Sequence, residues 1–373
     1  MSIAPIRPKW PGTMTDRERF NNQMHYRPMD RCFNKEFAYW KANFSTWRIF
    51  RENGITNNAE ADAFFGFDRE AGVGGLGMNP RFEHEVIEET EDKQIIRNSE
   101  GLIAEVPKDG HDTIPHFIKS SINTPADWAD VKAERYRRDD PDRRVDVEAL
   151  IKEHPPERDY PLGVHCGSMI GHVRNLLTFE GLAYACYDYP DMVEDMVETH
   201  CVLVEDFLDQ VLGRLDFDFA AGWEDICFKS GPIVSVPFFR EVVVPRYKRI
   251  SDRLGAHGID VYFTDCDGDI RPILPLFLEA GLNCMFPWEV NSSGHPGAEM
   301  DRYGKNLLVM GGVDKIALGH GRDAIKGYLE SLAPYVERGG FIPHCDHRCP
   351  PNVDENDYLY YLDLKRRMFG LKE

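Results

Sequence analysis

The sequence predicts an α/β protein, a (β/α)8 barrel with an elaborated amino-terminal region. From about residue 160 onward, short apolar runs alternate with longer segments of helical periodicity, which is typical of parallel strands joined by crossover helices. No Gly-x-Gly-x-x-Gly motif follows a predicted strand, which weakens the alternative of a doubly wound dinucleotide-binding sheet. We expect a single domain over residues 1–373, with helices and a small meander in 1–125 and most of the barrel in 126–373.

The amino-terminal part is predicted to contain two helical segments, Thr15–His25 and Asn34–Asn53. From Glu83 to Pro107, polar and apolar residues alternate in the manner of an antiparallel meander, with polar turns at Glu91-Asp92 and at Ser99-Glu100-Gly101. Since the repeating region supplies only six predicted strands, the amino-terminal part must provide the remaining strands of the ring.

The elements after residue 160 follow from apolar runs and helix-start signals. A long helix opens at Pro190, because apolar residues then recur at steps of three and four. Ser235 and Pro237 start another helix, which ends at Gly255 and is kinked at Pro245. The predicted strands are Pro161–Cys166, Asp216–Ala221, Ile259–Thr264, Asn283–Phe286, Asn306–Gly311 and Phe341–Pro343. The other predicted helices are Gly171–Tyr187, Ile270–Ala280, Arg322–Val336 and Asp354–Phe369.

Composition restricts the classes of partner. With 63 acidic and 44 basic residues the formal charge is −19, so the chain lacks the basic field that nucleic acid or an anionic membrane normally requires. No apolar run approaches the roughly 18 residues of a membrane span, and no secretory signal is evident. The nine cysteines therefore indicate reduced thiols, and we expect a cytoplasmic protein.

Acidic residues follow two predicted strands, at the ends where a parallel barrel carries its active site. Asp265 and Asp267 should face the same way and Cys266 the opposite way, because side chains alternate along a strand. Two converging carboxylates repel each other unless a cation or a shared proton lies between them. Glu224 and Asp225 end another strand, where they are either a metal ligand, acid or substrate anchor, or a helix-capping pair.

Two further strand ends add candidate ligands. Glu289 directly follows one strand, and the last strand leads into a segment rich in zinc-ligand types, Pro343-His344-Cys345-Asp346-His347-Arg348-Cys349. Because no second ligand pair is near in sequence, a metal site shared with Asp265 and Asp267 is favoured over a separate one. His165 and Cys166 face opposite sides of their strand and indicate packing or substrate contact instead.

These motifs together resemble the uroporphyrinogen decarboxylase superfamily, within it the cobalamin-dependent methyltransferases. The resemblance covers nearly the whole chain and lies in the order and spacing of several segments. They are Asp16-Arg17-Glu18-Arg19-Phe20, Pro28-Met29-Asp30-Arg31, Trp223-Glu224-Asp225, Asp265–Asp269, Gly311–Lys315, Gly339–Pro343, Asp346-His347 and Pro350-Pro351. The decarboxylase carries an Arg-rich amino-terminal stretch that binds its tetrapyrrole carboxylates, which residues 1–50 lack. The resemblance therefore favours the methyltransferase branch.

In the coenzyme M methyltransferases, zinc is held by a His-x-Cys pair followed by Gly and by a distant Cys. Aligned on Gly268, that pair becomes Asp265 and Asp267, and the distant Cys falls on or near His347. Such a harder ligand set makes the metal a stronger Lewis acid, which suits an ether oxygen better than a thiolate. The metal ligands implied are Asp265, Asp267, His347 and Glu224, with zinc or a similar divalent ion; Cys266, Cys345 and Cys349 stay open as ligands.

The function implied is an O-demethylase component that moves a methyl group from a small methylated compound, such as a methoxylated aromatic, to the cobalt of a corrinoid protein. Glu224 and Asp267 would be catalytic, and Asp225, Glu289, His165 and Arg31 would contact substrate. The corrinoid would arrive on a partner protein, and a homodimer is compatible with the resemblance. The alternatives are a metal-independent decarboxylase in which Asp267 donates a proton, and a non-catalytic binding protein on an inherited barrel.

Overall fold

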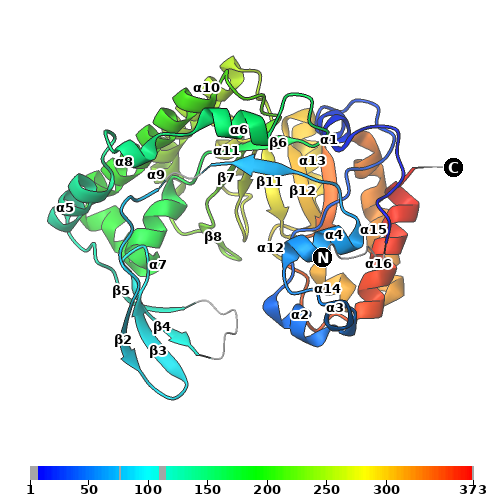
Figure 1. The fold of residues 1–373 in the computed structure, drawn as a ribbon, viewed down its shortest axis with the longest axis horizontal. Helices are drawn as coiled ribbons and strands as arrows, with labels where there is room; N and C mark the ends of the chain where they lie inside the picture. The colour runs from blue at the N-terminus through cyan, green and yellow to red at the C-terminus, as the bar shows by residue number, and fades with distance from the viewer. Residues whose placement is uncertain (1–6, 75–76, 109–114, 372–373) are drawn as a thin grey trace.

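The computed structural model describes residues 7–74, 77–108 and 115–371 of the chain. Its centre is a sheet of seven parallel strands with helices packed along it (Figure 1). In spatial order the strands are β1 (Ala71–Val73), β6 (Leu162–His165), β7 (Phe219–Trp223), β10 (Tyr262–Asp265), β11 (Cys284–Trp288), β12 (Leu308–Val313) and β13 (Phe341–Cys345). The predicted α/β class and the six predicted strands after residue 160 are confirmed.

The two faces of this sheet bury different clusters, as expected for a sheet that curls around an interior. Phe219 and Ala221 of β7 belong to an inner apolar cluster that also contains Phe20 and Met24, whereas Ala220 faces the main core under the helices. Phe20 and Met24 come from α1 (Asp16–Met24), where Arg17 also pairs with Asp218, just before β7. Helix α1 therefore covers the amino-terminal end of the strands and leaves the carboxyl ends for the site.

The amino-terminal part supplies one paired strand to the ring, β1, and among the described residues no ladder joins β1 to β13. An irregular segment, residues 33–39, lies between them: Asp68 donates its amide to the Asn34 carbonyl, and Cys349 donates to that of Ala38. The helix predicted over Asn34–Asn53 is therefore wrong in its first part, and α2 (Lys41–Thr46) and α3 (Arg48–Asn53) form only the second. These tertiary contacts outweigh the local helical preference.

The predicted meander is confirmed and gains a fourth strand. The antiparallel sheet contains β2 (Glu85–Glu89), β3 (Lys93–Arg97), β4 (Ile103–Pro107) and β5 (His116–Lys119). In Figure 1 this sheet projects beside α7 (Ile170–Asp188), on the side of the molecule where α12 (Val290–Ser293) and α14 (Lys315–Leu318) follow β11 and β12. Just after β5, the Ser120 hydroxyl donates to the Leu176 carbonyl, which ties this sheet to α7, the helix that follows β6.

The main helices agree with the predicted periodicity. The apolar face predicted for the Pro190 helix is buried in α8 (Pro190–Val211), and Ser235 caps α9 (Val236–Phe238). The kink expected near Pro245 is a π-helical turn, Phe239–Val243, before α10 (Val244–Ala256). The remaining elements are α4 (Asn58–Phe65), α5 (Pro125–Arg135), α6 (Val147–Glu153), β8 (Cys227–Phe228), β9 (Gly231–Pro232), α11 (Leu274–Glu279), α13 (Gly297–Tyr303), α15 (Arg322–Arg338), α16 (Glu355–Phe369) and the 3-10 turns Pro141–Arg143 and Gly304–Asn306. Among helices in the described ranges, none is long and apolar enough to cross a membrane.

Candidate functional site

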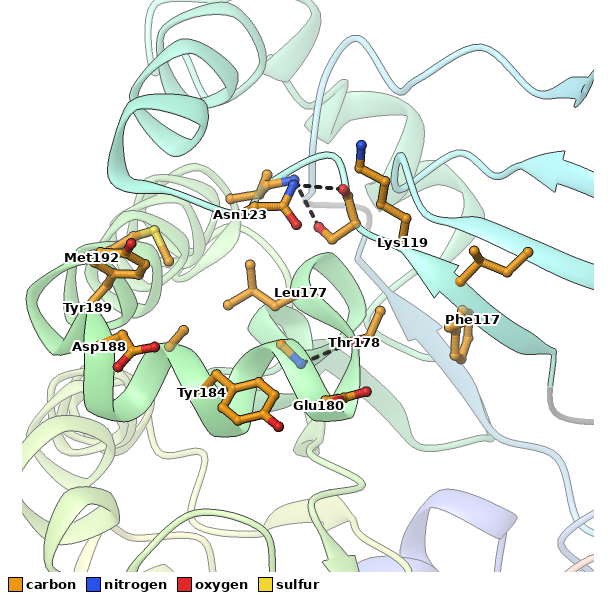
Figure 2. A pocket seen from close by; sticks show the side chains of 15 residues that line it. Phe117, Lys119, Asn123, Leu177, Thr178, Glu180, Tyr184, Asp188, Tyr189 and Met192 are labelled. Atoms are coloured by element: carbon orange, nitrogen blue, oxygen red, sulfur yellow. Dashed lines mark hydrogen bonds between the residues drawn. The ribbon is translucent and has the colours of Figure 1, made fainter.

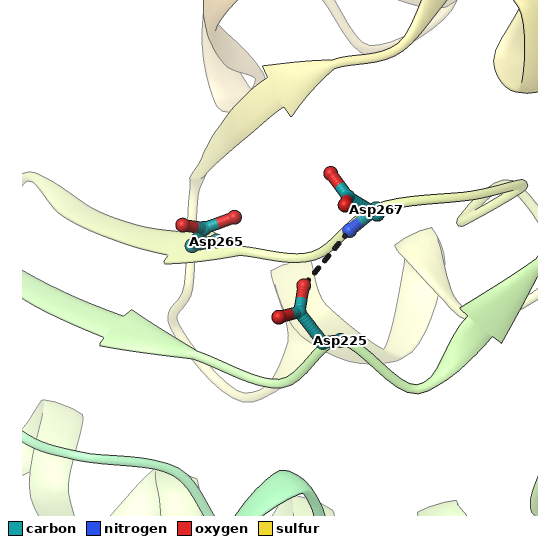
Figure 3. A group of neighbouring side chains, drawn as sticks. All are labelled: Asp225, Asp265 and Asp267. Atoms are coloured by element: carbon teal, nitrogen blue, oxygen red, sulfur yellow. Dashed lines mark hydrogen bonds between the residues drawn. The ribbon is translucent and has the colours of Figure 1, made fainter. Parts of the chain in front are cut away.

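Three carboxylates meet at the carboxyl ends of β7 and β10. Asp225, Asp265 and Asp267 each offer one oxygen within 4.8 Å of the others (Figure 3). Asp265 ends β10, and Asp267 follows two residues later on the same side, as the strand period predicts. The amide of Asp267 donates to Oδ1 of Asp225 at 3.3 Å, which joins the two loops. We call these three residues the acid cluster.

The acid cluster brings three partly buried carboxyl groups close together, which opposes three negative charges. Burial, reinforced by Asp225 and Asp267, raises the pKa of Asp265 to about 8. Burial and the Asp267 carboxylate also raise the pKa of Asp225. Oδ1 of Asp267 is buried and has no hydrogen-bond partner. An oxygen-rich set with one unpartnered buried acceptor fits a divalent cation, which would remove the repulsion.

His347 lies beside the acid cluster, with Nε2 3.3 Å from Oδ2 of Asp267. Its ring contacts those of Phe37, at 5.4 Å between centroids, and Trp40, at 5.6 Å with an angle of 30° between the planes. The structure thus brings together three of the four predicted metal ligands: Asp265, Asp267 and His347. Phe37 and Trp40 were not singled out from the sequence, because they come from the segment predicted to be helical.

Glu224 does not join these residues, which corrects its assignment as a metal ligand and catalytic acid. Its carboxylate is fully buried and accepts hydrogen bonds from the amides of residues 169–171, from Ser168 Oγ and from Tyr247. An anion at a helix amino terminus satisfies amides that have no partner inside the helix. Glu224 therefore anchors the start of α7, close to the capping alternative, and Asp225 takes its place in the acid cluster.

Glu289 borders the acid cluster, but both of its carboxylate oxygens already accept hydrogen bonds from other residues of the protein. One oxygen accepts the Gly268 amide at 2.9 Å, and the other pairs with Lys315 Nζ at 2.5 Å. Asp346 accepts the amides of Val290 and Lys315, and burial raises its pKa to about 6. These contacts fix the loops after β10, β11, β12 and β13 relative to one another. Glu289 thus holds the loop that carries Asp267, a role that the predicted substrate contact did not include.

Arg31 is wrong as a substrate-binding residue. Its guanidinium is buried and makes two hydrogen bonds to the Asp68 carboxylate, at 2.6 and 2.8 Å, and others to main-chain carbonyls. His165 ends β6 with an exposed side chain whose ring lies against Gly72 of β1, where a Cβ would come within 2.3 Å of Nε2. The structure leaves His165 outside the acid cluster, and its predicted substrate contact stays a prediction.

The cysteines near the site also lie outside the acid cluster. Cys266 is buried on the opposite side of its strand and contacts the Cys227 thiol, and that contact together with burial raises the pKa of Cys266 well above its ordinary value. Cys345 and Cys349 are likewise buried, and all nine cysteines are free. The prediction of reduced thiols is consistent with this arrangement, and oxygen and imidazole ligands remain the available set at the acid cluster.

The raised pKa of Asp265 predicts how stability and metal affinity depend on pH. Between its ordinary pKa near 3.8 and about 8, the folded metal-free protein holds a proton that the unfolded chain releases, so stability falls as pH rises. The maximum slope is about 1.4 kcal/mol per pH unit. In thermal unfolding with chelator, Asp265→Asn should lack this part of the decline. In calorimetry, wild-type metal affinity should rise up to about pH 8, since binding displaces the proton. Identical pH profiles for the two proteins would contradict this assignment.

A family model decides the wider relationship. The model of the uroporphyrinogen decarboxylase (URO-D) family matches residues 104–367 of the chain. The chain belongs to this family. The matched region contains the acid cluster, His347 and every strand of the parallel sheet except β1. Among curated proteins, no match is found.

The URO-D family assignment agrees with the fold of known structures. A methyltransferase from Methanosarcina mazei is 12% identical, with a TM-score of 0.55 over 95% of this chain and 98% of that one. At this identity the likeness shows that the fold is shared. The family model confirms the predicted superfamily, and the barrel architecture of the URO-D family agrees with the curled parallel sheet of this chain.

Proposed function

We propose that this URO-D family member is a metal-dependent methyltransferase, the O-demethylase component that moves a methyl group from a methoxylated aromatic compound to the cobalt of a corrinoid protein. The observation that carries the proposal is the acid cluster, with its unpartnered Asp267 oxygen and with His347 at 3.3 Å. The ligands we assign are Asp225, Asp265, Asp267 and His347. Zinc or a similar divalent ion suits these oxygen and nitrogen donors.

Aromatic side chains around the acid cluster support an aromatic substrate. Phe37 contacts both His347 and Phe286, and Phe286 lies next to Asp265 in the register of β10 and β11. Phe37 and Trp40 are only partly buried, and the Arg348 guanidinium lies 5.0 Å from the centroid of the Trp40 ring. A substrate ring packed there would carry its methoxy group toward the acid cluster.

The residues at and around the acid cluster would have different roles in such a transfer. The three carboxylates and His347 hold the ion, and Asp265 releases its proton when the ion binds. Glu289 and Lys315 keep the Asp267 loop in place. The ion, when bound, supplies Lewis-acid stabilisation of the oxygen that leaves the methyl group. The cobalt is expected on a separate corrinoid protein, since the sequence contains no evident corrinoid-binding segment.

A metal-independent decarboxylase is the second candidate, and one observation favours it. With a pKa of about 8, Asp265 holds a proton at neutral pH in the metal-free protein and could protonate a carbanion. This role replaces the one that the sequence suggested for Asp267. The two candidates differ in whether the active protein contains metal.

Metal analysis and a methyl-transfer assay separate the candidates. Purified protein should hold about one divalent ion per chain, and incubation with a reduced corrinoid protein and methoxylated aromatics should produce methylcobalt absorption. Chelation should abolish the signal, and added zinc should restore it. Absence of both stoichiometric metal and methylcobalt across ethers, alcohols and amines would reject the methyltransferase in favour of the decarboxylase.

A further inference from the structure

Two strained backbone positions are connected to one arginine, one directly and the other through a neighbouring ring. Among the described residues, three residues other than glycine have a positive φ: Tyr26, Thr178 and Asp225. Asp225 has φ 48° and Thr178 has φ 72°, which is a rare conformation for a β-branched residue. Such conformations persist only where the surroundings hold them, and they concentrate at functional sites. Arg174 is linked to both.

Arg174 binds the main chain of Asp225. Its Nη1 donates to the Asp225 carbonyl oxygen, while the Asp225 carboxylate accepts the Asp267 amide and belongs to the acid cluster. The guanidinium thus holds the peptide group of the strained residue and leaves its carboxylate directed to Asp267. The Arg174 charge also lowers the pKa of the Asp225 carboxyl, against the larger effect of burial.

The guanidinium is itself fixed by aromatic rings. It lies 5.6 Å from the ring centroid of Trp223 and 5.1 Å from that of Phe179, and Asn175 Oδ1 accepts from two of its nitrogens. The Phe179 ring packs at 5.0 Å on Phe228, three residues after Asp225. The rings therefore come from both sides of the Asp225 turn and from α7.

Thr178 accounts for the position of Phe179. Its extended ψ and positive φ interrupt α7, and its hydroxyl accepts the Gly181 amide at 3.2 Å, which restarts the helix (Figure 2). The break directly precedes Phe179, one of the two rings against Arg174. The strain at Thr178 and the strain at Asp225 are thus parts of one arrangement around the guanidinium.

We infer that Arg174 is a positioning residue that holds Asp225 in its left-handed conformation and thereby completes the metal site. The inference rests on the proposed function for the metal, and it concerns how the site is built. Arg174 acts through the Asp225 carbonyl and touches neither metal nor substrate. Lysine cannot reproduce its planar stacking, so the effect belongs to the guanidinium and is more than one of charge.

The test compares Arg174→Met, Arg174→Lys, Asp225→Asn and the Arg174→Met/Asp225→Asn double variant. By calorimetry with zinc alone, Arg174→Met should weaken binding by about 10- to 100-fold, the usual effect of groups that orient ligands. Arg174→Lys should recover only part of it. The double variant should bind no more weakly than Asp225→Asn alone, because Arg174 acts through Asp225.

A second measurement does not depend on metal. Hydrogen exchange in chelator should be faster for residues 223–228 in Arg174→Met, while Arg240→Met, which removes an exposed arginine paired with Glu279, should change neither exchange nor zinc affinity. Unchanged exchange with unchanged zinc affinity in Arg174→Met, or additive losses in the double variant, would overturn the inference. Faster exchange in a protein that binds no zinc would instead reject the proposed function and leave the positioning role standing.

Discussion

Asp267→Asn is expected to lose stoichiometric divalent metal and, with it, methyl transfer. Asp267 is the one member of the acid cluster that contacts both other parts of the site: its amide binds Asp225, and its carboxylate faces His347. Its unpartnered Oδ1 is the oxygen most in need of a cation. Loss of a direct ligand should exceed the roughly 10- to 100-fold loss of affinity caused by removing an orienting group.

The matched control is Asp269→Asn, which makes the same chemical change in the same loop. Asp269 pairs with Arg271 at 2.8 Å and lies outside the acid cluster. This variant should keep its metal, measured by elemental analysis after dialysis, and most of its activity. Full metal content in Asp267→Asn, or equal losses in both variants, would contradict the site.

Glu224→Ala is expected to destabilise the fold by about 3–5 kcal/mol, the usual cost of leaving buried charged networks unpaired. The substitution leaves three consecutive amides at the start of α7, and the hydroxyls of Ser168 and Tyr247, without their hydrogen-bond acceptor. Chemical denaturation with a metal-loaded and a chelated sample measures the cost. The Glu224 carboxylate contacts none of the cluster carboxylates, and the variant keeps the main-chain hydrogen bond from the amide of residue 224 to the Asp265 carbonyl, so both samples should lose the same amount.

Glu180→Ala, at an exposed position on the same helix, is the control and should change stability by less than about 0.5 kcal/mol. Glu224→Gln, which keeps an acceptor, should fall between the two. If Glu224→Ala kept wild-type stability while losing metal or activity, Glu224 would be a ligand or proton donor, as the family resemblance implied.

The geometry of the acid cluster could be predicted where it depends on the strand period. Asp265 and Asp267 share a face, and Cys266 faces away, because β10 runs straight into them. The segment after β13 could be placed near them because β13 is parallel to β10 within one sheet, so their carboxyl ends share an edge, and the family resemblance selected His347 within that segment. The shared face therefore follows from strand alternation, and the shared edge follows from the sheet topology.

The exchange of roles between Glu224 and Asp225 could not be predicted in the same way. It depends on the left-handed turn at Asp225, which Arg174 holds from a different element. One sequence signal was available: Gly171 lies where a Cβ would come within 2.2 Å of the Glu224 carbonyl, so a glycine at a helix start marked a close approach. Only the structure shows that Glu224 is the residue that approaches Gly171.

The first stretch of the predicted Asn34–Asn53 helix failed for a different physical reason. Glu36 is buried and accepts the Cys345 amide, the Tyr361 hydroxyl and the Lys365 ammonium, all from the other end of the chain. Periodicity within a short window contains no information about partners so remote. The same long-range contacts bring Phe37 and Trp40 to His347. The sequence therefore did not predict that these two rings lie beside the candidate site.

The segment 33–39 between β1 and β13 also sets when the site can exist during synthesis. Glu36 and Cys345 are 309 positions apart, and Glu36 and Lys365 are 329 apart. Segment 33–39 can therefore form these contacts only after most of the chain has been synthesised. Contacts this distant slow folding. His347 emerges two residues after Cys345 and before Lys365, so the last of the proposed metal ligands becomes available to the nascent chain together with the first of these remote partners of Glu36.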